Sequence, residues 1–399
     1  MIDIEAFIAN CVIRRKESMF QQDFLQHSEA LRKRIAGKSV LVIGGAGSIG
    51  SSFIKALLPF EPRSLVVVDT NENGLTELTR DLRSSGIYVP DDYVTYPMSY
   101  ADTTFTKLFK KRGGFDIVAN FSAHKHVRSE KDLYSVEALL KNNVMNAKGL
   151  LDLLCDYKPE HFFCVSTDKA ANPVNIMGGS KKLMEDMIMA YANEFCVTTA
   201  RFANVAFSNG SLPAGFLERI AKHQPLSAPS DVTRYFVSPE ESGQICLMAC
   251  MLGKTGQIYF PKLSEEQVLT FSEIAKALLR ELGYEPLECK DEQEAIAKAK
   301  AGDGKQYPVY FSKSDTTGEK PYEEFYTEGE EVNLAQYKSL GVITVKDFKT
   351  RAAIEELIRT FATLFEREDT KKEDITQVMK AFLVNFDHKE TGKYLDAKM

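Results

Sequence analysis

Tryptophan is absent from the sequence, and histidine and cysteine are scarce: the 399 residues include six histidines and seven cysteines. The histidines are scattered except for His124 and His126, so the sequence predicts no metal site. The number of cysteines is odd, no CxxC pair occurs, and most of them lie in apolar runs. Buried thiols in a reducing compartment fit this pattern better than a disulfide framework.

Long hydrophobic runs are also absent. No stretch reaches the ~18 consecutive apolar residues of a transmembrane helix. The N-terminus carries Asp3 and Glu5 ahead of its basic residues and has no small-residue cleavage site, so it does not resemble a signal peptide. We therefore expect a cytoplasmic protein without a membrane span.

An excess of positive charge is absent as well. Lys and Arg number 50 against 56 Asp and Glu, which gives a net charge of −6. Such a chain has no global attraction for nucleic acid or anionic lipid, so we expect no nucleic-acid partner. An anionic small ligand would need a local binding device. The hydrophobic share of 44% and the charged share of 27% are typical of a globular protein.

Short apolar runs alternate with amphipathic helices between residues 39 and 205. The runs are too apolar for half-exposed strands, which indicates a parallel sheet covered by helices on both faces. The sequence therefore predicts an α/β fold with a Rossmann-type, doubly wound parallel sheet. We expect strands at 39–44, 64–69, 116–121, 161–166 and 197–205, and helices at 48–58, 72–85, 134–156, 179–194, 239–252 and 271–283.

The first strand runs directly into a glycine-rich turn, with Gly44, Gly47 and Gly50 at its first, fourth and seventh positions. This spacing permits a tight turn, close approach of the backbone to a pyrophosphate, and close packing of the next helix. Asp69 ends the second strand, where an acidic residue accepts hydrogen bonds from a ribose diol and repels a 2′-phosphate. The combination predicts an NAD site and disfavours NADP. A plain turn with Asp69 as a helix N-cap explains it less well.

Polar residues follow the fourth apolar run, in the order Ser166, Thr167, Asp168 and Lys169. The carboxyl ends of parallel strands face the ligand crevice, so these side chains are placed to touch substrate. A solvated Asp–Lys pair in a loop is the alternative. The segment from Met177 to Lys181 then opens a helix, and Lys181 taken alone would also pass for a surface lysine.

Several motifs occur in an order that resembles a known family, the extended short-chain dehydrogenases/reductases that act on nucleotide sugars. The closest branch is the capsular-polysaccharide type of UDP-N-acetylglucosamine 4,6-dehydratase, in which methionine, here Met177, stands where most of the superfamily has tyrosine. The resemblance covers residues 37–285 and resumes at 318–324. The matching motifs are the glycine turn, Asn120–His126, Asn143-Val144, Ser166–Ala170, Asn175–Lys181, Arg201–Val205 and Thr233–Phe236.

The resemblance implies a reaction and roles for its residues. C4 of the sugar loses a hydride to NAD, a base removes the C5 proton, water leaves from C6, and the hydride returns to C6. The resemblance assigns Lys169 as the C5 base, Asp168 as the acid at C6, and Thr167 as the partner of O4. Met177 has no proton to donate, and Lys181 hydrogen-bonds the nicotinamide ribose. A neutral Lys169 needs a lowered pKa, which we expect from a desolvated site beside the nicotinamide cation.

The resemblance also implies binding roles. Arg234 is expected at the diphosphate, because guanidinium binds phosphate in a bidentate manner, although a loop charge can equally be solvated. The expected substrate-binding residues are His124, Lys125, Asn204, Val205 and Arg234. The expected NAD-binding residues are Gly44, Gly47, Ser48, Ile49, Gly50, Asp69, Ser99, Tyr100, Asn120, Ser122, Ala123 and Lys181.

Three features depart from the family pattern. Ser99 stands where an Asp usually reads adenine, with Asp102 further on, and Thr316 and Thr317 replace an Arg-Pro pair that helps to hold the pyrophosphate. Residues 288–314 look inserted or rewritten, and residues 288–320 are charged and predicted to form an exposed segment. The exact sugar and nucleotide therefore stay open.

We divide the chain into an N-terminal helical extension at 1–36, an NAD-binding Rossmann domain at 37–225, a smaller α/β substrate-binding region at 226–345 and a C-terminal helical extension at 346–399. We expect a homodimer or higher homo-oligomer, because relatives dimerise through the helices at 134–156 and 179–194. The expected activity is that of a nucleotide-sugar 4,6-dehydratase, a lyase, in surface polysaccharide biosynthesis. A nucleotide-sugar C4 epimerase and a non-catalytic NAD-binding scaffold are the alternatives.

Overall fold

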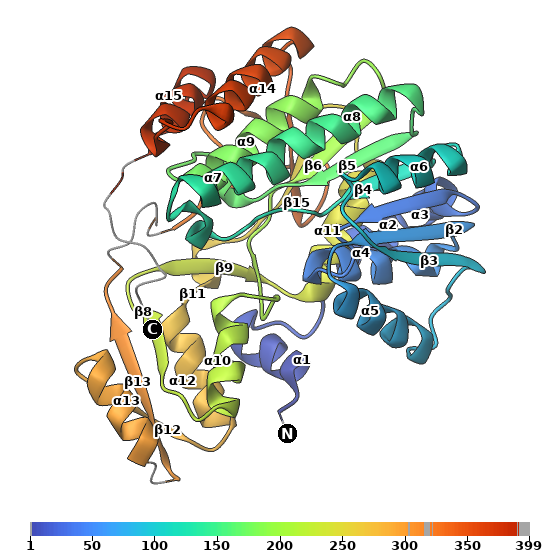
Figure 1. The fold of residues 1–399 in the computed structure, drawn as a ribbon. Helices are drawn as coiled ribbons and strands as arrows, with labels where there is room; N and C mark the ends of the chain where they lie inside the picture. The colour runs from blue at the N-terminus through green and yellow to red at the C-terminus, as the bar shows by residue number, and fades with distance from the viewer. Residues whose placement is uncertain (1, 302–303, 315–319, 321, 389, 391–399) are drawn as a thin grey trace.

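The computed structural model describes residues 2–301, 304–314, 320, 322–388 and 390 (Figure 1). Its main feature is a nine-stranded sheet in the order β14-β15-β10-β6-β5-β4-β1-β2-β3. The strands from β10 to β3 are all parallel, and β15 and β14 continue the sheet in antiparallel fashion. The strands are β1 Ser39–Ile43, β2 Ser64–Asp69, β3 Asp92–Pro97, β4 Ile117–Asn120, β5 His161–Val165, β6 Cys196–Ala200, β10 Gln257–Pro261, β14 Glu331–Asn333 and β15 Leu340–Thr344.

Helices cover both faces of this sheet, which confirms the doubly wound α/β fold (Figure 1). One face carries α3 Ser28–Ile35, α4 Ser48–Leu57, α5 Glu72–Ser84 and α11 Pro239–Leu252. The other carries α6 Thr103–Arg112, α7 Leu133–Leu140, α8 Asn146–Asp156 and α9 Ile176–Met189, and a π-helical turn at Lys141–Met145 joins α7 to α8. Chain order around β1 reverses between β2 and β4, and such a reversal opens a crevice at the carboxyl ends of the strands.

Two strands differ from the expectation. The edge strand β3 was not predicted, because Asp92–Pro97 is polar, aromatic and half-exposed and has no continuous apolar run. The expected strand at 197–205 is in fact two: β6 ends at Ala200, and β7 Asn204–Val205 pairs with β9 Thr233–Val237 in a second sheet. The break carries the chain from the large sheet into the smaller unit.

The smaller unit contains two three-stranded sheets, β11-β9-β7 and β12-β13-β8. Part of the segment 288–320, predicted to be exposed, is instead the central strand β13, where Val309 is fully buried. The apolar run within β13 supplies the buried side chains despite the charged flanks. The other elements are β8 Leu226–Pro229, α10 Leu212–Ala221, β11 Val268–Thr270, α12 Phe271–Glu281, β12 Glu285–Glu288, α13 Glu292–Ala301 and β13 Gln306–Ser312.

The N-terminal extension is not one helix. It forms α1 Ile4–Phe7, a π-helical turn at Ile8–Val12, α2 Gln21–Gln26 and α3, and Arg14 takes a left-handed φ of 54° between them. Phe7 packs in the core of the smaller unit, whereas Phe20 packs in the core of the large sheet. The apolar residues of segment 1–36 therefore pack in two different cores. Their spacing along the sequence looks continuous because both parts of the segment contain helical turns.

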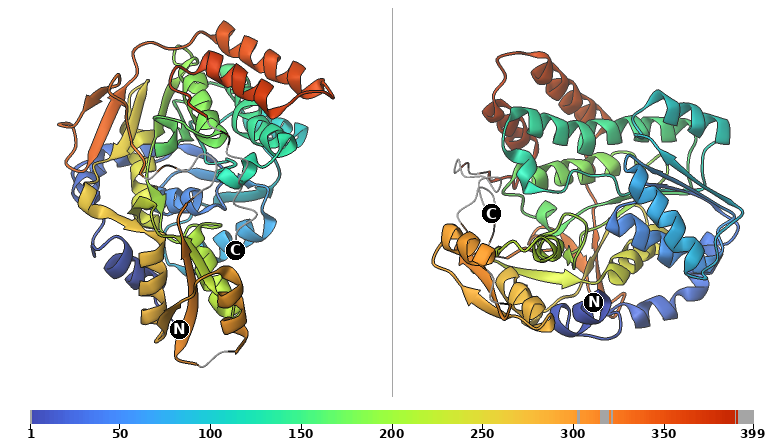
Figure 2. Two further views of the ribbon diagram at one scale, coloured as in Figure 1. Left: turned by 90° about the vertical axis from the view of Figure 1, so that its left-hand side faces the viewer. Right: turned by 60° about the horizontal axis from the view of Figure 1, so that its bottom comes forward.

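The C-terminal extension forms two helices, α14 Arg351–Glu366 and α15 Lys372–Phe382, where one helical stretch was expected. Thr370 ends the first helix by donating its hydroxyl to the carbonyl of Leu364 at 2.5 Å. Both views in Figure 2 place these red helices against the green helices of the large unit. Residues 226–345 contribute to both units, since β10, β14 and β15 extend the large sheet. The division at residue 225 therefore stays a prediction about folding units.

Two features of the sequence, its cysteines and its short hydrophobic runs, can be compared with the structure. All seven cysteines are free thiols. Among the described residues, no helix has the length and hydrophobicity needed to cross a bilayer.

Asp23 on α2 connects the N-terminal extension to the large sheet. Its carboxylate is 1% exposed and accepts backbone N–H groups of Lys338 and Ser339, both at 2.7 Å, just before β15. Asp23→Ala should lower the free energy of unfolding by about 3 kcal/mol, because two backbone N–H groups lose a charged acceptor. Urea unfolding measures this change. Gln22→Ala, which removes only an exposed contact to the Lys338 side chain, is the matched control, and equal effects of both changes would contradict the assignment.

Candidate active site

The glycine turn after β1 has the geometry of an anion cradle. Gly44 has a φ of +74°, and a Cβ there would lie 2.6 Å from the backbone nitrogen of Ser122. A Cβ on Gly50 would clash with the carbonyl of Gly44, so α4 packs directly on the turn. A Cβ on Gly47, the N-cap of α4, would meet only the Gly44 carbonyl oxygen among the described residues outside its own helix, at 3.4 Å. Space is therefore left at the N-terminus of α4, where N–H groups attract a phosphate.

Asp69 and Ser48 are fixed on either side of this turn. The Asp69 carboxylate accepts the N–H groups of Ala46 at 3.0 Å and Asn71 at 2.9 Å. Each of its oxygens keeps a lone pair for a further donor such as a ribose hydroxyl. Ser48 accepts the backbone N–H of Asn209 at 2.8 Å, which joins the turn, with Ile49 next in α4, to the smaller unit.

The end of β4 carries a buried amide without a partner. Asn120 is fully buried, its Oδ1 accepts the N–H of Ser122 at 3.0 Å, and its Nδ2 has no hydrogen-bond partner among the described residues. Ala123 follows on the same half-exposed segment. A dinucleotide carries hydrogen-bond donors and acceptors along its length. The Nδ2 of Asn120, the open space at Gly47 and the Asp69 carboxylate together fit such a ligand.

Ser99 and Tyr100 have local roles. Ser99 forms a turn in which its N–H donates to Asp102 at 3.3 Å and its hydroxyl accepts the N–H of Ala101 at 3.2 Å. The Tyr100 hydroxyl donates to the carbonyl of Asn142 at 2.9 Å, and burial raises its pKa. These contacts hold the segment after β3; an adenine-binding role for either residue stays a prediction.

The residues after β5 form a compact hydrogen-bonded group. Asp168 is 2% exposed, and its Oδ1 accepts three donors: the Thr167 hydroxyl at 2.7 Å, the Lys169 N–H at 2.9 Å and the Lys169 ammonium at 3.0 Å. Three donors on one oxygen stabilise the ionised carboxylate. The buried Asp168 and the half-buried Lys169 thus form a directly hydrogen-bonded acid–base pair.

A second carboxylate lies on the other side of Lys169. Glu323 is 6% exposed, and its Oε1 is 3.8 Å from the Lys169 ammonium and 3.9 Å from the Arg234 guanidinium. Burial raises the pKa of Glu323, against the effect of the two cations. Arg234 also donates to the carbonyls of Thr233 at 2.8 Å and Lys320 at 2.9 Å. Glu323 therefore joins the expected elimination lysine to the expected phosphate-binding arginine.

Two carboxylates act on the pKa of Lys169. Burial lowers this pKa, but Asp168 and Glu323 outweigh burial, so the pKa is raised above its ordinary value. The sequence did not reveal the second carboxylate, and the lowered pKa expected beside the nicotinamide cation stays a prediction.

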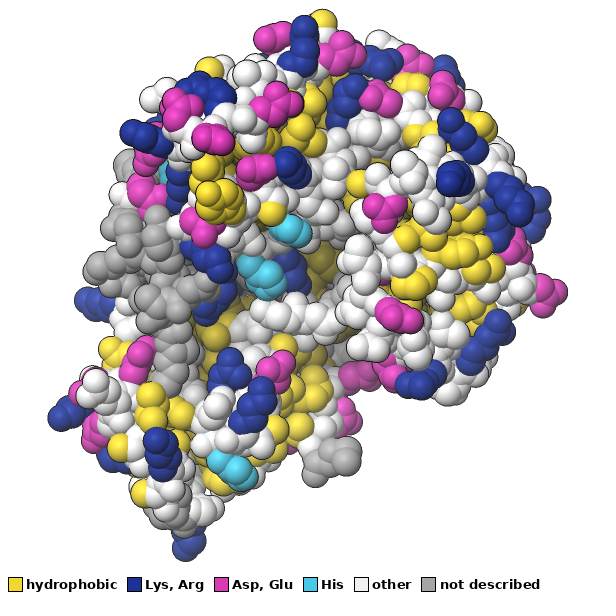
Figure 3. Space-filling model, in the orientation of Figure 1, with side chains coloured by type: hydrophobic (Ala, Val, Ile, Leu, Met, Phe, Trp, Pro, Cys, Tyr) yellow, Lys and Arg dark blue, Asp and Glu magenta, His cyan; other side chains and the backbone are white. Residues whose placement is uncertain are grey.

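One cavity of about 590 Å³ collects most of the expected substrate residues. Figure 3 shows the hollow on this face, bordered by histidine and basic side chains. Asn209 connects the cavity to the glycine turn, since its carbonyl accepts the Lys125 ammonium at 2.8 Å while its N–H binds Ser48. The lining includes Lys125, Lys169, Asn204, Val205, Arg234 and Glu323.

Met177, Lys181 and His124 lie outside this lining. Met177 is 2% exposed within the main core, and Lys181 donates its ammonium to the carbonyl of Val165 at 2.8 Å. Burial lowers the pKa of Lys181. His124 is held through its backbone, which exchanges hydrogen bonds of 2.8 and 2.9 Å with Asn143. Thr316 and Thr317 lie outside the described residues.

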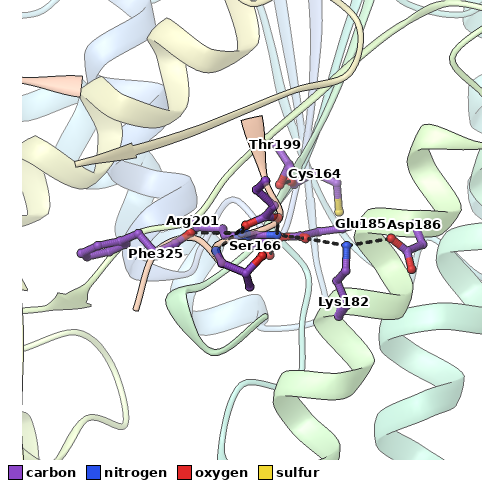
Figure 4. A network of polar contacts seen from close by, with 10 residues as sticks. Cys164, Ser166, Lys182, Glu185, Asp186, Thr199, Arg201 and Phe325 are labelled. Atoms are coloured by element: carbon purple, nitrogen blue, oxygen red, sulfur yellow. Dashed lines mark hydrogen bonds and ion pairs between the residues drawn. The ribbon is translucent and has the colours of Figure 1, made fainter. Parts of the chain in front are cut away.

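A network of buried ion pairs and hydrogen bonds adjoins the end of β5 (Figure 4). Arg201, at the end of β6, is fully buried and donates to Glu185 of α9 at 2.8 and 2.7 Å and to Glu330 at 2.9 and 2.8 Å. It also donates to the carbonyl of Phe325 at 3.0 Å, and Ser166 donates to Glu185 at 2.6 Å. The segment bearing Glu323 is therefore held in place by Arg201.

Sequence reasoning missed Glu323, and it gave no role to Arg201 or Glu185. Arg201 had a signal: it is a single charge within an apolar run, which requires a buried partner. Glu185 had no such signal, because Asp186 is adjacent to it and two lysines lie just before it. Glu323 lies in the matching motif at 318–324, but nothing in its spacing placed it beside Lys169, more than 150 residues away. Only the fold brings these residues together.

Glu130 is a further buried carboxylate, next to the catalytic segment. It is 1% exposed, and its Oε1 accepts the backbone N–H of Met177 at 2.8 Å. Burial raises its pKa from 4.5 to about 7, although the N–H groups of Met177 and Ile176 act in the opposite direction. Its other carboxylate oxygen has no hydrogen-bond partner among the described residues.

Comparison with protein families gives a clear match. A family model described as polysaccharide biosynthesis protein matches residues 40–345, which contain every expected site residue. The chain belongs to this family. Family membership supports the resemblance in its broad form, an enzyme related to NAD-dependent sugar dehydratases and epimerases, and leaves the Met177 feature as an expectation.

Individual members of the family and related structures differ in their described activity. An uncharacterized membrane protein of Methanocaldococcus jannaschii is 32% identical over 77% of this chain and 85% of its own. A UDP-N-acetylglucosamine 4,6-dehydratase (inverting) of Campylobacter jejuni is 25% identical over 76% and 86%. UDP-glucose 4-epimerases of Rickettsia species match 60% of this chain and 70% of theirs at 26–29% identity. The structure of a dTDP-glucose 4,6-dehydratase from Streptomyces venezuelae, 19% identical, aligns over 84% of this chain and 99% of its own with a TM-score of 0.56, which supports the fold.

Replacement of Glu323 by glutamine should lower the pKa of Lys169, because the negative charge that stabilises its ammonium is removed while the shape is kept. Trace acetylation at a series of pH values, followed by peptide mass spectrometry, measures the pKa of this one amine. Glu324→Gln is the control, since the Glu324 side chain is exposed and binds Asn172. An unchanged Lys169 pKa in Glu323→Gln would show that the two side chains are not coupled.

Glu130 predicts a pH dependence of stability. A carboxyl whose pKa is raised on folding stabilises the protein below its unfolded pKa, and this contribution disappears as the pH rises through the folded pKa of about 7. The change amounts to roughly 3 kcal/mol between pH 4.5 and pH 8. Glu130→Gln should remove it, so the variant becomes more stable than the wild type above pH 7 and similar to it near pH 4.5. Urea midpoints at both pH values test this, and parallel pH profiles would refute it.

Proposed function

We propose that this protein is a nucleotide-sugar 4,6-dehydratase that uses NAD and acts on UDP-N-acetylglucosamine in the biosynthesis of a surface polysaccharide or glycan. The observation that carries the proposal is the buried Asp168–Lys169 pair, hydrogen-bonded at 3.0 Å, with Lys169 on the cavity wall. Elimination of water across C5 and C6 needs one base and one acid close together, and this pair supplies both.

NAD would be held by the cradle at Gly47, by Asp69 at the adenosine ribose, and by Asn120, whose Nδ2 is unpaired among the described residues. When bound, it accepts a hydride from C4 of the sugar and returns it to C6. Lys181 of α9 reaches the end of β5 with its ammonium, which donates to the carbonyl of Val165 and has further N–H donors for the nicotinamide ribose.

Thr167 and Asp168 handle the proton of O4 in this proposal. The Thr167 hydroxyl donates to Asp168 at 2.7 Å, so it can accept the O4 proton while passing its own to the carboxylate. Asp168 then becomes the carboxylic acid that protonates the departing O6. The proton that leaves O4 therefore ends on the released water, and Asp168 returns to its ionised form.

Lys169 must lose a proton before it can act at C5. Protonation of Asp168 removes the closest counter-charge of the ammonium, which lowers the pKa of Lys169. Glu323, 3.8 Å away, takes the proton once the two groups close to hydrogen-bond length, because burial raises its pKa. The neutral amine abstracts the C5 proton and later returns one to C5, and Glu323 then restores the ammonium.

The C4 epimerase is the second candidate, favoured by the epimerases that match this chain. An epimerase needs only hydride transfer and rotation of the sugar, so it has no use for a buried acid–base pair at the C5–C6 side. A non-catalytic NAD-binding scaffold has no use for it either. The pair at the end of β5 supports dehydration over both.

Incubation of the protein with UDP-N-acetylglucosamine, followed by NMR of the sugar, separates the candidates. A dehydratase converts the C6 hydroxymethyl into a methyl; an epimerase changes C4 and leaves C6 intact; a scaffold changes no UDP, GDP or dTDP sugar. Lys169→Met and Asp168→Asn should each lower turnover by about 10³-fold, because general acid–base catalysis is lost. Glu324→Gln is the control, and near-normal turnover of Lys169→Met would overturn the assignment.

A further inference from the structure

The C-terminal extension lies against the catalytic segment, although it falls outside residues 40–345, which the family model matches. Figure 1 shows α14 and α15 above α7 and α9, at the side of the molecule opposite the smaller unit. Residues 372–388, which comprise α15 and the described residues directly after it, contact both the start of α9 and the loop that precedes it.

Gly179 in the first turn of α9 leaves room for this contact. A Cβ at Gly179 would clash with the Met379 Cε of α15 and would lie 3.0 Å from the Phe386 ring. Met379 is fully buried and Phe386 is 6% exposed. Because Gly179 has no side chain, Met379 and Phe386 of the extension can pack directly against α9.

Polar contacts hold the loop at 171–175 in the same way. The Lys372 ammonium donates to the carbonyl of Glu130 and to the Glu390 carboxylate, both at 2.6 Å. The backbone N–H of Asp387 donates to the carbonyl of Pro173 at 3.2 Å, and the His388 ring lies 3.3 Å from the carbonyl of Val174. The extension thus binds the backbone of the loop and of Glu130, whose carboxylate accepts the N–H of Met177.

This segment is in direct contact with the elimination lysine. A Cβ on Gly178 would lie 2.6 Å from the carbonyl oxygen of Lys169, so the first turn of α9 packs on the Lys169 backbone. A shift of α9 or of the loop would move Lys169 relative to the cavity. Displacements of about 1 Å are enough to lower a rate by 10²-fold.

We propose that residues 372–388, together with Glu390, are a positioning element for the catalytic segment: they hold residues 171–179 and thereby fix where Lys169 stands. Lys372 and His388 are its positioning residues, and neither is among the residues that line the cavity. The catalytic consequence rests on the proposed function, whereas the effect on the loop itself does not. The alternative is that the extension only covers apolar surface and stabilises the fold as a whole.

Hydrogen exchange of the full-length protein tests the proposal without reference to activity. Lys372→Met keeps the aliphatic stem and removes the ammonium contacts; His388→Leu removes the contact to Val174. Each should speed exchange in peptides covering 171–179 by about 10-fold while exchange in β1 and α4 stays unchanged. Arg359→Met on α14, which loses only an exposed pair with Glu356, is the matched control and should leave the loop unchanged.

The outcomes separate the alternatives. Unchanged exchange at 171–179 in both variants would overturn the proposal, and so would a uniform increase across the whole chain, which is the mark of a general stabiliser. If the protein proves to be a dehydratase, both variants should also lower kcat by about 10-fold with KM and NAD affinity little changed. If it converts no sugar, the exchange result still decides whether the extension positions the loop.

Discussion

The buried charge of Arg201 is the constraint on which the rest of the site depends. A guanidinium removed from water must be surrounded by acceptors, and breaking such a pair costs about 3–5 kcal/mol. The acceptors of Arg201 come from α9 and from the segment 325–330, and Glu185 also receives the Ser166 hydroxyl from the end of β5. Burial would raise the pKa of Glu185, but Arg201 lowers it, so the pair stays charged. One cation thus sets the relative positions of the three segments that carry the chemistry.

This arrangement gives Lys169 two carboxylate neighbours with different environments. Asp168 receives three hydrogen bonds on one oxygen, which stabilises its charge, whereas Glu323 is buried at 3.8 Å from its nearest cation. Groups whose surroundings favour opposite protonation states can divide acid and base tasks at one pH. The raised pKa of Lys169 follows from the same geometry. In the proposed mechanism, reaction at C5 would therefore have to follow neutralisation of one of these carboxylates.

The sequence predicted the elements whose stability is local and missed those that depend on distant partners. The apolar run at 64–69 and the helix at 239–252 coincide with β2 and α11, because each is an apolar segment with clear boundary residues. β3 is recognisable as a strand only through its register with β2. The glycine turn and the Asp168–Lys169 pair were found because one stretch of chain contains all their parts. Glu323 was not, because its position depends on Arg201.

The location of the proton-handling groups also explains why a thioether is compatible with catalysis at Met177. Its side chain is 2% exposed in the core, so the helix position that usually carries a tyrosine base serves packing here. Its N–H binds Glu130, which in turn is held through its carbonyl by Lys372. In the proposed mechanism Met177 offers no ionisable group, so the O4 proton would leave toward the end of β5, where Thr167 already donates to Asp168. Under that proposal oxidation and elimination would share one carboxylate, and the position of Lys169 would depend on α9 and the loop before it.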